Sequence, residues 1–98
     1  GQKIEQTYLE RIDKINKEIN IKIIVSLSCT MCPELVTSAQ RIASLNKQII
    51  TEVYDIQHFK QLKDQYQIMS VPCMVINDQK VVFGKKNIEQ ILEIIENV

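Results

Sequence analysis

Cys29 and Cys32, separated by two residues, are the side chains whose chemistry is easiest to recognise in this sequence. They follow a run of strand-forming residues, 21–27, and precede a run of helix-forming residues that begins at Pro33. A cysteine pair with this spacing at the start of a helix closes into a small disulfide, or opens to a dithiol, with little motion of the backbone. The pattern therefore predicts reversible thiol-disulfide exchange.

The two thiols are expected to have different roles. Thiol exchange proceeds through the thiolate, which the partial positive charge and free amide groups of a helix N-terminus stabilise. We expect Cys29, the more exposed of the two, to be the catalytic nucleophile, and Cys32 to be the resolving thiol that releases a mixed disulfide. Glu34 opposes this activation because its carboxylate competes for the same helix end, and residues 21–25 offer no carboxylate as a proton acceptor.

A second motif, Val71-Pro72, directly precedes a short predicted strand. Proline lacks an amide hydrogen, so the start of a strand is where it does least harm. If the bond before it is cis, the bend leaves the backbone of Val71 free to pair with an extended substrate segment beside the cysteines. We predict Val71 and Pro72 as substrate-docking residues, together with Thr30 and Met31 between the two cysteines.

Four further residues are weaker candidates. Cys73 follows Pro72 and is expected to lie near the cysteine pair, either as an accessory thiol that traps intermediates or as a small buried core residue. His58 is expected to be a solvated surface residue. Met69 and Met74 flank the proline, and they are expected either to line an apolar docking rim or to fill the core.

Metal binding is the main alternative from another functional class. A Cys-x-x-Cys motif between a strand and a helix also occurs in heavy-metal-binding domains, so the chain could be a copper or zinc carrier. Structural zinc normally has four ligands, however, and only Cys73 and His58 remain to supply them. Such domains also normally carry a methionine two positions before the first cysteine, where this chain has Leu27. We therefore predict no metal site.

The composition excludes several kinds of partner. With 98 residues, 45% of them apolar and 24% charged, the chain fits one compact domain. The 12 basic and 12 acidic side chains give no net field for phosphates, so nucleic acid is not an expected partner. No apolar run approaches the roughly 20 residues that span a bilayer, and the polar start is not a signal peptide. We expect a cytoplasmic protein that does not bind membranes.

Hydrophobic periodicity predicts the elements that position the cysteines. We expect a single domain, 1–98, in which an N-terminal helix within residues 1–20 precedes a core of residues 21–98 with the order βαβαββα. This order is typical of an α/β fold with one mixed sheet flanked by helices. The predicted elements are helix 3–19, strand 21–27, helix 33–46, strand 49–54, a helix from Asp55 as its N-cap to Tyr66, strands 73–76 and 80–83 around the turn 77–79, and a last helix capped by Asn87.

With the cysteine pair, Val71-Pro72 and this order of elements, the chain resembles the thioredoxin and glutaredoxin superfamily. The stretch 26–34, Ser-Leu-Ser-Cys-Thr-Met-Cys-Pro-Glu, and the helix around residues 8–12 make it similar to the N-terminal domain of the F subunit of alkyl hydroperoxide reductase. In particular it resembles the second of that domain's two thioredoxin-like halves. The resemblance extends over residues 5–97.

The resemblance implies a thioredoxin-like fold and an electron relay from a flavoprotein reductase to the disulfide of a peroxiredoxin or another disulfide protein. Cys29 and Cys32 match the family's redox pair, and Pro72 matches its cis-proline. FAD and NAD(P)H are implied only for a parent or partner protein, so this chain is expected to bind no cofactor and to use its own disulfide. The flavin domain and the other thioredoxin-like half are not in this sequence, and Thr30-Met31 replaces the His-Asn of several relatives. A stand-alone glutaredoxin- or thioredoxin-like reductase is therefore the nearest alternative.

Overall fold

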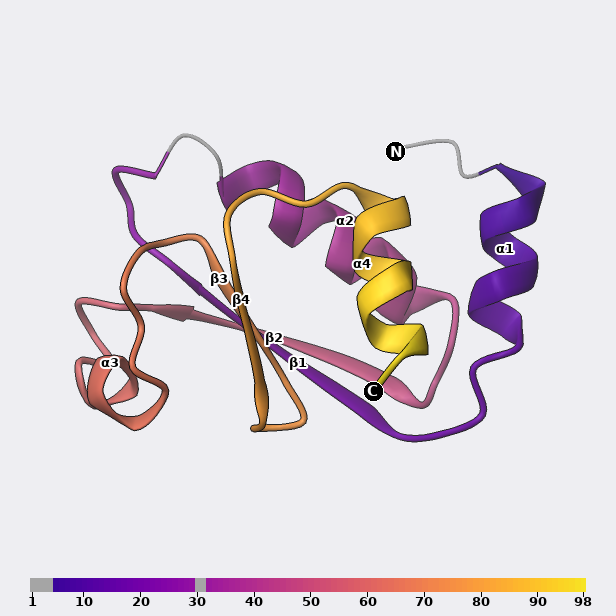
Figure 1. Ribbon diagram of the computed structural model, residues 1–98. Coiled ribbons are helices and arrows are strands. Elements are labelled where there is room, and N and C mark those ends of the chain that lie inside the picture. The colour runs from indigo at the N-terminus through magenta and orange to yellow at the C-terminus, as the bar shows by residue number, and fades with distance from the viewer. Residues whose placement is uncertain (1–4, 30–31) are drawn as a thin grey trace.

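The computed structural model describes residues 5–29 and 32–98, and it contains a four-stranded sheet in the order β2-β1-β3-β4 (Figure 1). The predicted order of elements, with an extra helix before the first strand, is confirmed. The helices are α1 (Gln6–Asp13), α2 (Cys32–Ser44), α3 (Gln61–Gln65) and α4 (Ile88–Glu96), and the strands are β1 (Ile19–Val25), β2 (Ile49–Asp55), β3 (Cys73–Ile76) and β4 (Lys80–Phe83).

The direction of the strands brings the two sequence motifs to one end of the sheet. β1 runs parallel to β2, with Val25 opposite Asp55, and antiparallel to β3, with Ile24 opposite Cys73. The end at which β1 stops is therefore also the end at which β3 begins. We call this the disulfide end of the sheet, because the chain continues from it into the cysteine motif on one strand and arrives from Val71-Pro72 on the next.

Helices cover both faces of the sheet. α2 and α4 pack on one face and α3 lies on the other, while α1 packs beside α4 (Figure 1). β1 contributes isoleucines to both faces, in keeping with a central strand that is buried on each side. The core on the α2 side includes Ile21, Ile23, Leu35, Ile42, Met74 and Leu92, and the smaller core on the α3 side consists of Ile24, Leu62, Ile68, Cys73 and Val75.

Two local signals in the second half of the chain are confirmed. Asn77 and Asp78 adopt positive φ angles of 52° and 59° in the turn that joins β3 to β4, as short polar residues tolerate. Asn87 caps α4 through a capping box: its side chain accepts from the Gln90 N–H, and the Gln90 side chain accepts from the Asn87 N–H, both at 2.9 Å.

The prediction of one long N-terminal helix through residue 19 is wrong. α1 ends at Asp13, and Ile19 already belongs to β1, where its N–H donates to the Gln48 carbonyl at 2.9 Å. The Asn46 side chain donates to the carbonyls of Ile12 and Ile15 at 2.8 and 2.9 Å, which satisfies acceptors where the helix stops. These tertiary hydrogen bonds override the helical periodicity of the segment.

The prediction of a helix that starts at Asp55 is also wrong. Asp55 is the last residue of β2; its carbonyl accepts from the N–H groups of His58 and Phe59, and its side chain accepts from Gln57. Only Gln61–Gln65 are helical. Asp55 thus terminates the strand with a turn, a local alternative that aspartate offers as readily as a helix cap.

Strand and helix boundaries beside the cysteines shift as well. β1 ends at Val25 instead of residue 27, and α2 spans Cys32–Ser44 instead of 33–46. Leu27, which the prediction placed in the strand, lies in a turn and is 93% exposed. The cysteine motif therefore starts from a turn beyond the strand.

Candidate functional site

Cys29 and Cys32 form a disulfide whose Cα atoms lie 5.6 Å apart at the disulfide end of the sheet. Cys29 closes a turn that begins at Ser26, since its N–H donates to the Ser26 carbonyl at 3.1 Å. Cys32 is the first residue of α2. Thr30 and Met31, predicted to take part in docking, lie outside the described residues.

The two sulfur-bearing residues differ in exposure. Cys29 is half-buried, whereas Cys32 is only 5% exposed. Because Cys32 lies at the N-terminus of a helix of 13 residues, the pair faces amide groups without intrahelical acceptors and the positive end of the helix dipole. Glu34 occupies the same first turn and places a carboxylate there. A half-buried cysteine and a shielded cysteine at a helix N-terminus suit successive steps of disulfide exchange.

The Val71-Pro72 peptide bond is cis, and the predicted docking role of Val71 depends on this isomer. Pro72 is buried and its carbonyl accepts from the N–H of Gly84 at 2.9 Å. Among residues 5–29 and 32–98, the N–H and carbonyl of Val71 have no hydrogen-bond partner. The segment before β3 thus presents, at the disulfide end, backbone groups that no other described residue occupies.

Gly84 also contributes to this site, and the sequence motifs did not reveal its role. Its φ of +93° is a conformation that glycine adopts without steric cost, and it lets the chain after β4 turn toward Pro72. The available signal was a lone glycine directly after a strand that pairs with the strand following Pro72.

Cys73 is a buried core residue, which is one of the two roles expected from its sequence position. Its side chain is fully buried with Leu62 and Ile68 on the α3 side of the sheet, whereas Cys32 begins the helix on the other side. It is a free thiol, and burial raises its pKa to about 11. An un-ionised, solvent-inaccessible thiol is a poor nucleophile.

The remaining candidate residues differ in their exposure to solvent. His58 is exposed in the turn after β2, Met69 is 88% exposed, and Met74 is fully buried in the core. Within the part of the chain that the structure describes, no three His, Cys, Asp or Glu side chains are grouped closely enough to hold a metal ion. In that same part, no helix is long and apolar enough to cross a membrane.

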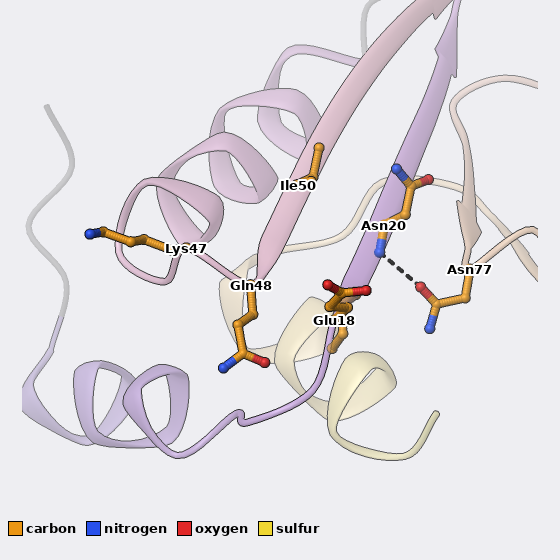
Figure 2. Close-up of a pocket in the computed structure, with 7 residues that line it drawn as sticks. Glu18, Asn20, Lys47, Gln48, Ile50 and Asn77 are labelled. Carbon is orange, nitrogen blue, oxygen red and sulfur yellow. Dashed lines mark hydrogen bonds between the residues drawn. The ribbon is translucent and has the colours of Figure 1, made fainter.

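A shallow cavity of about 350 Å³ lies away from the cysteines, where β1 and β2 begin. Figure 2 shows its lining, in which the Asn20 N–H donates to the Asn77 side chain at 2.8 Å and Ile50 projects from β2. Its lining contains no cysteine, serine, threonine or histidine, and the disulfide lies at the opposite end of the sheet.

Comparison with known proteins agrees with this geometry. The family model described as "Thioredoxin domain" matches residues 19–96, which include the disulfide and the cis-proline. The chain belongs to the thioredoxin domain family. The predicted thioredoxin-like fold is thereby confirmed.

Relatives with larger sequences extend the comparison. The chain is 31% identical to the "NADH dehydrogenase" of Ferdinandcohnia aciditolerans over 92% of its length, and 30% identical to the F subunit of the alkyl hydroperoxide reductase of Pseudomonas putida over 86%. It spans only 17% and 16% of the length of these relatives. The crystal structure of the NTD_N/C domain of AhpF from Enterococcus faecalis (V583) superposes with a TM-score of 0.90 and 40% identity, over 96% of this chain and 45% of that one. The predicted resemblance to the N-terminal domain of the alkyl hydroperoxide reductase F subunit is confirmed.

Proposed function

We propose that this thioredoxin domain transfers electrons by thiol-disulfide exchange, receiving them from a flavoprotein reductase domain and delivering them to the disulfide of a peroxiredoxin. The observation that carries the proposal is the Cys29–Cys32 disulfide at the N-terminus of α2, with one sulfur-bearing residue half-buried and the other shielded. The kinds of donor and acceptor are suggested by the relatives named as an NADH dehydrogenase and as the F subunit of an alkyl hydroperoxide reductase.

The exchange begins from the reduced pair. The Cys29 thiolate attacks one sulfur of the partner's disulfide, a bond forms between that sulfur and Cys29 Sγ, and the partner's other sulfur leaves as a thiolate. Cys32 then loses its proton and attacks Cys29 Sγ, which releases the partner's second thiolate and restores the Cys29–Cys32 disulfide. The partner gains two electrons and, from solvent and Cys32, two protons. A dithiol of the donor protein reverses this sequence on the next cycle.

Val71 and Pro72 are proposed to hold the partner during the attack. An extended segment can pair with the free N–H and carbonyl of Val71, in the manner of a strand added to a sheet. The hydrogen bond from the Gly84 N–H to the Pro72 carbonyl holds the backbone next to Val71 in place. FAD and NAD(P)H would be bound by the donor, and the cytoplasm is the proposed compartment because its reducing poise keeps a dithiol available.

A reconstituted chain of electron transfer tests the proposal. The reduced protein is mixed with an oxidised peroxiredoxin, and free thiols on the peroxiredoxin are counted after separation. We expect about one peroxiredoxin disulfide to be reduced per protein molecule, and continuous turnover of peroxide once NADH and a flavoprotein disulfide reductase are added. If the fully reduced protein reduced no protein disulfide, the exchange function would be refuted.

A further inference from the structure

The two most exposed large apolar side chains among the described residues are Leu27 and Met69, at 93% and 88%. Single apolar side chains on a surface are ordinary. Here, however, the two that make least contact with the protein both lie on segments that meet at the disulfide end. Neither belongs to the cysteine motif or to the cis-proline, so the exchange chemistry alone does not require them.

Leu27 is held outward by the turn that leads into Cys29. The turn is closed by the hydrogen bond from the Cys29 N–H to the Ser26 carbonyl, and the hydroxyls of Ser26 and Ser28 lie 3.3 Å apart on either side of Leu27. Leu27 therefore stands at the tip of a turn with defined geometry. Its position is fixed relative to the half-buried Cys29, two residues further on.

Met69 is held outward by the residues around it. Ile68 is only 5% exposed, and its N–H donates to the Lys63 carbonyl at 2.9 Å. On the other side, Val71 packs against the same α3-side core and leads into the buried Pro72. With both flanks anchored, Met69 projects from a supported backbone two residues before Val71, whose N–H and carbonyl have no partner among the described residues.

The strand register brings these segments together. Ile24 of β1 lies opposite Cys73 of β3, so the chain that leaves β1 toward Leu27 and the chain that arrives from Met69 emerge from neighbouring strands. The free backbone of Val71 lies on the second of these segments. An extended peptide paired with Val71 and directed at Cys29 would therefore have apolar side chains of this protein on both sides.

An exposed lysine follows the glycine that is hydrogen-bonded to Pro72. The Gly84 N–H is bonded to the Pro72 carbonyl, and Lys85, the next residue, is exposed. Lys86 uses its ammonium group on the Phe83 carbonyl at 2.7 Å, while Lys85 forms no ion pair within the described residues. Glu34 supplies an opposing charge in the first turn of α2, so the electrostatic contribution of Lys85 is expected to be modest.

We propose that Leu27, Met69 and Lys85 determine which disulfide proteins this domain reduces. The occupant is an extended segment of the partner protein, with apolar side chains on both sides of its disulfide cysteine and a carboxylate that reaches Lys85. Its backbone pairs with Val71 while its cysteine sulfur meets Cys29 Sγ. This assignment rests on the proposed exchange function and specifies its substrate class.

Peptide substrates test the apolar contacts. Two short peptides are prepared as mixed disulfides with thionitrobenzoate, one with leucines beside its cysteine and one with serines. The reduced protein attacks the peptide sulfur, releases coloured thionitrobenzoate, and then frees the peptide thiol as the Cys29–Cys32 disulfide forms. With the leucine peptide, we expect Leu27→Ser and Met69→Ser each to lower the second-order rate about tenfold, as the loss of a buried apolar contact does.

The controls separate recognition from chemistry. With the serine peptide and with a small organic disulfide, Leu27→Ser and Met69→Ser should react as fast as the unmodified protein. Ile50→Ser removes an apolar side chain that is 57% exposed where β2 begins, and it should change no rate. Unaltered rates of the Leu27 and Met69 variants with the leucine peptide would overturn the proposal, as would an equal loss with the small disulfide.

Two peptides that differ by one charge test the proposed contact with Lys85. With glutamate placed in the leucine peptide, Lys85→Gln should slow the reaction about threefold at low salt, and high salt should remove the difference. The matched glutamine peptide should react equally with both proteins, and an equal loss with the two peptides would contradict the assigned contact. If the reduced protein released thionitrobenzoate from no substrate at all, the exchange function itself would be wrong, and the specificity assignment with it.

Discussion

Cys73 packs against Leu62 on one side of the sheet, whereas Cys32 begins the helix that covers the other side. Cys73 thus belongs to a different core from the one to which α2 contributes Leu35 and Ile42, although Cys73 directly follows the proline that accompanies the redox motif. Full burial and a pKa raised to about 11 keep the Cys73 thiol protonated at neutral pH. The geometry supports a structural role for Cys73 and leaves the exchange chemistry to Cys29 and Cys32.

Cys73 should resist alkylation in the folded protein. At neutral pH, iodoacetamide applied to the oxidised protein is expected to leave Cys73 unmodified, because a buried, protonated thiol neither meets the reagent nor attacks it. After unfolding in denaturant the same thiol should react fully. Mass spectrometry of tryptic peptides measures both states, and rapid modification of Cys73 in the native protein would contradict its assigned environment.

The pKa of Cys73 also predicts how stability depends on alkaline pH. Burial raises the folded-state pKa from 9.0 to about 11, so below pH 9 the thiol is protonated in both states and its contribution is intact. As pH rises from 9 toward 11, the unfolded chain releases a proton that the folded protein retains, and stability falls by up to about 3 kcal/mol. Between pH 9 and 11, Cys73→Ala should lose less stability than the unmodified protein. Urea unfolding at each pH measures the difference. If the two proteins showed the same pH dependence, burial of the Cys73 thiol would not be its cause.

Local sequence signals predicted the parts of the fold that local interactions determine. The pairing of β3 with β4, the turn at Asn77 and Asp78, and the Asn87 cap each depend on residues within a few positions, and all were predicted correctly. The early end of α1 depends instead on Asn46, which reaches the carbonyl of Ile12 from a distant part of the chain. No periodicity within residues 3–19 encodes that contact.

The features of the site also fall into those that local sequence predicts and those that depend on distant contacts. The cysteine spacing and its place between a strand and a helix could be read directly, because the chemistry depends on neighbours in sequence. The hydrogen bond between Gly84 and Pro72 and the burial of Cys73 on the α3 side of the sheet depend on strand pairing. Strand register decides on which side of the sheet a residue lies, and a one-residue difference reverses it.

The capping box of α4 should contribute to stability without affecting exchange. Asn87→Ala removes the acceptor of the Gln90 N–H and should lower the free energy of unfolding by about 1 kcal/mol. Asn87→Ser retains a side-chain oxygen at the cap and should recover most of that loss. Thermal and urea unfolding measure the difference, and an Asn87→Ala protein as stable as the unmodified one would show that the hydrogen bond is not formed in solution.

The ion pair between α1 and α4 should stabilise the protein only above acidic pH. Arg11 donates from Nε and Nη2 to the two oxygens of Glu96 at 3.0 and 2.7 Å, and these hydrogen bonds lower the pKa of Glu96 below its ordinary 4.5. The stabilisation is therefore present at neutral pH and is lost as pH falls below 4.5 through the lowered value. Since both side chains are about one-third exposed, we expect Arg11→Gln to cost about 0.5 kcal/mol at pH 7.

The control for this ion pair removes a charge elsewhere. Lys47→Gln removes an exposed positive charge that forms no ion pair within the described residues, and it should leave the free energy of unfolding unchanged at both pH values. Urea unfolding at pH 7 and pH 3 gives the comparison. If Arg11→Gln lowered the free energy of unfolding equally at both pH values, the titration of Glu96 would not be the cause of the loss.

Trapping the covalent intermediate tests the roles of the two redox cysteines most directly. Reduced Cys32→Ser protein is mixed with an oxidised disulfide partner, and the product is analysed by intact mass and by peptide mapping. We predict a stable mixed disulfide between Cys29 and the partner, because the thiol that resolves it is absent, whereas Cys29→Ser should form no such adduct at a comparable rate. Two results would contradict the proposed exchange. One is that Cys29→Ser forms an adduct through Cys32 as readily as Cys32→Ser forms one through Cys29. The other is that neither variant forms an adduct.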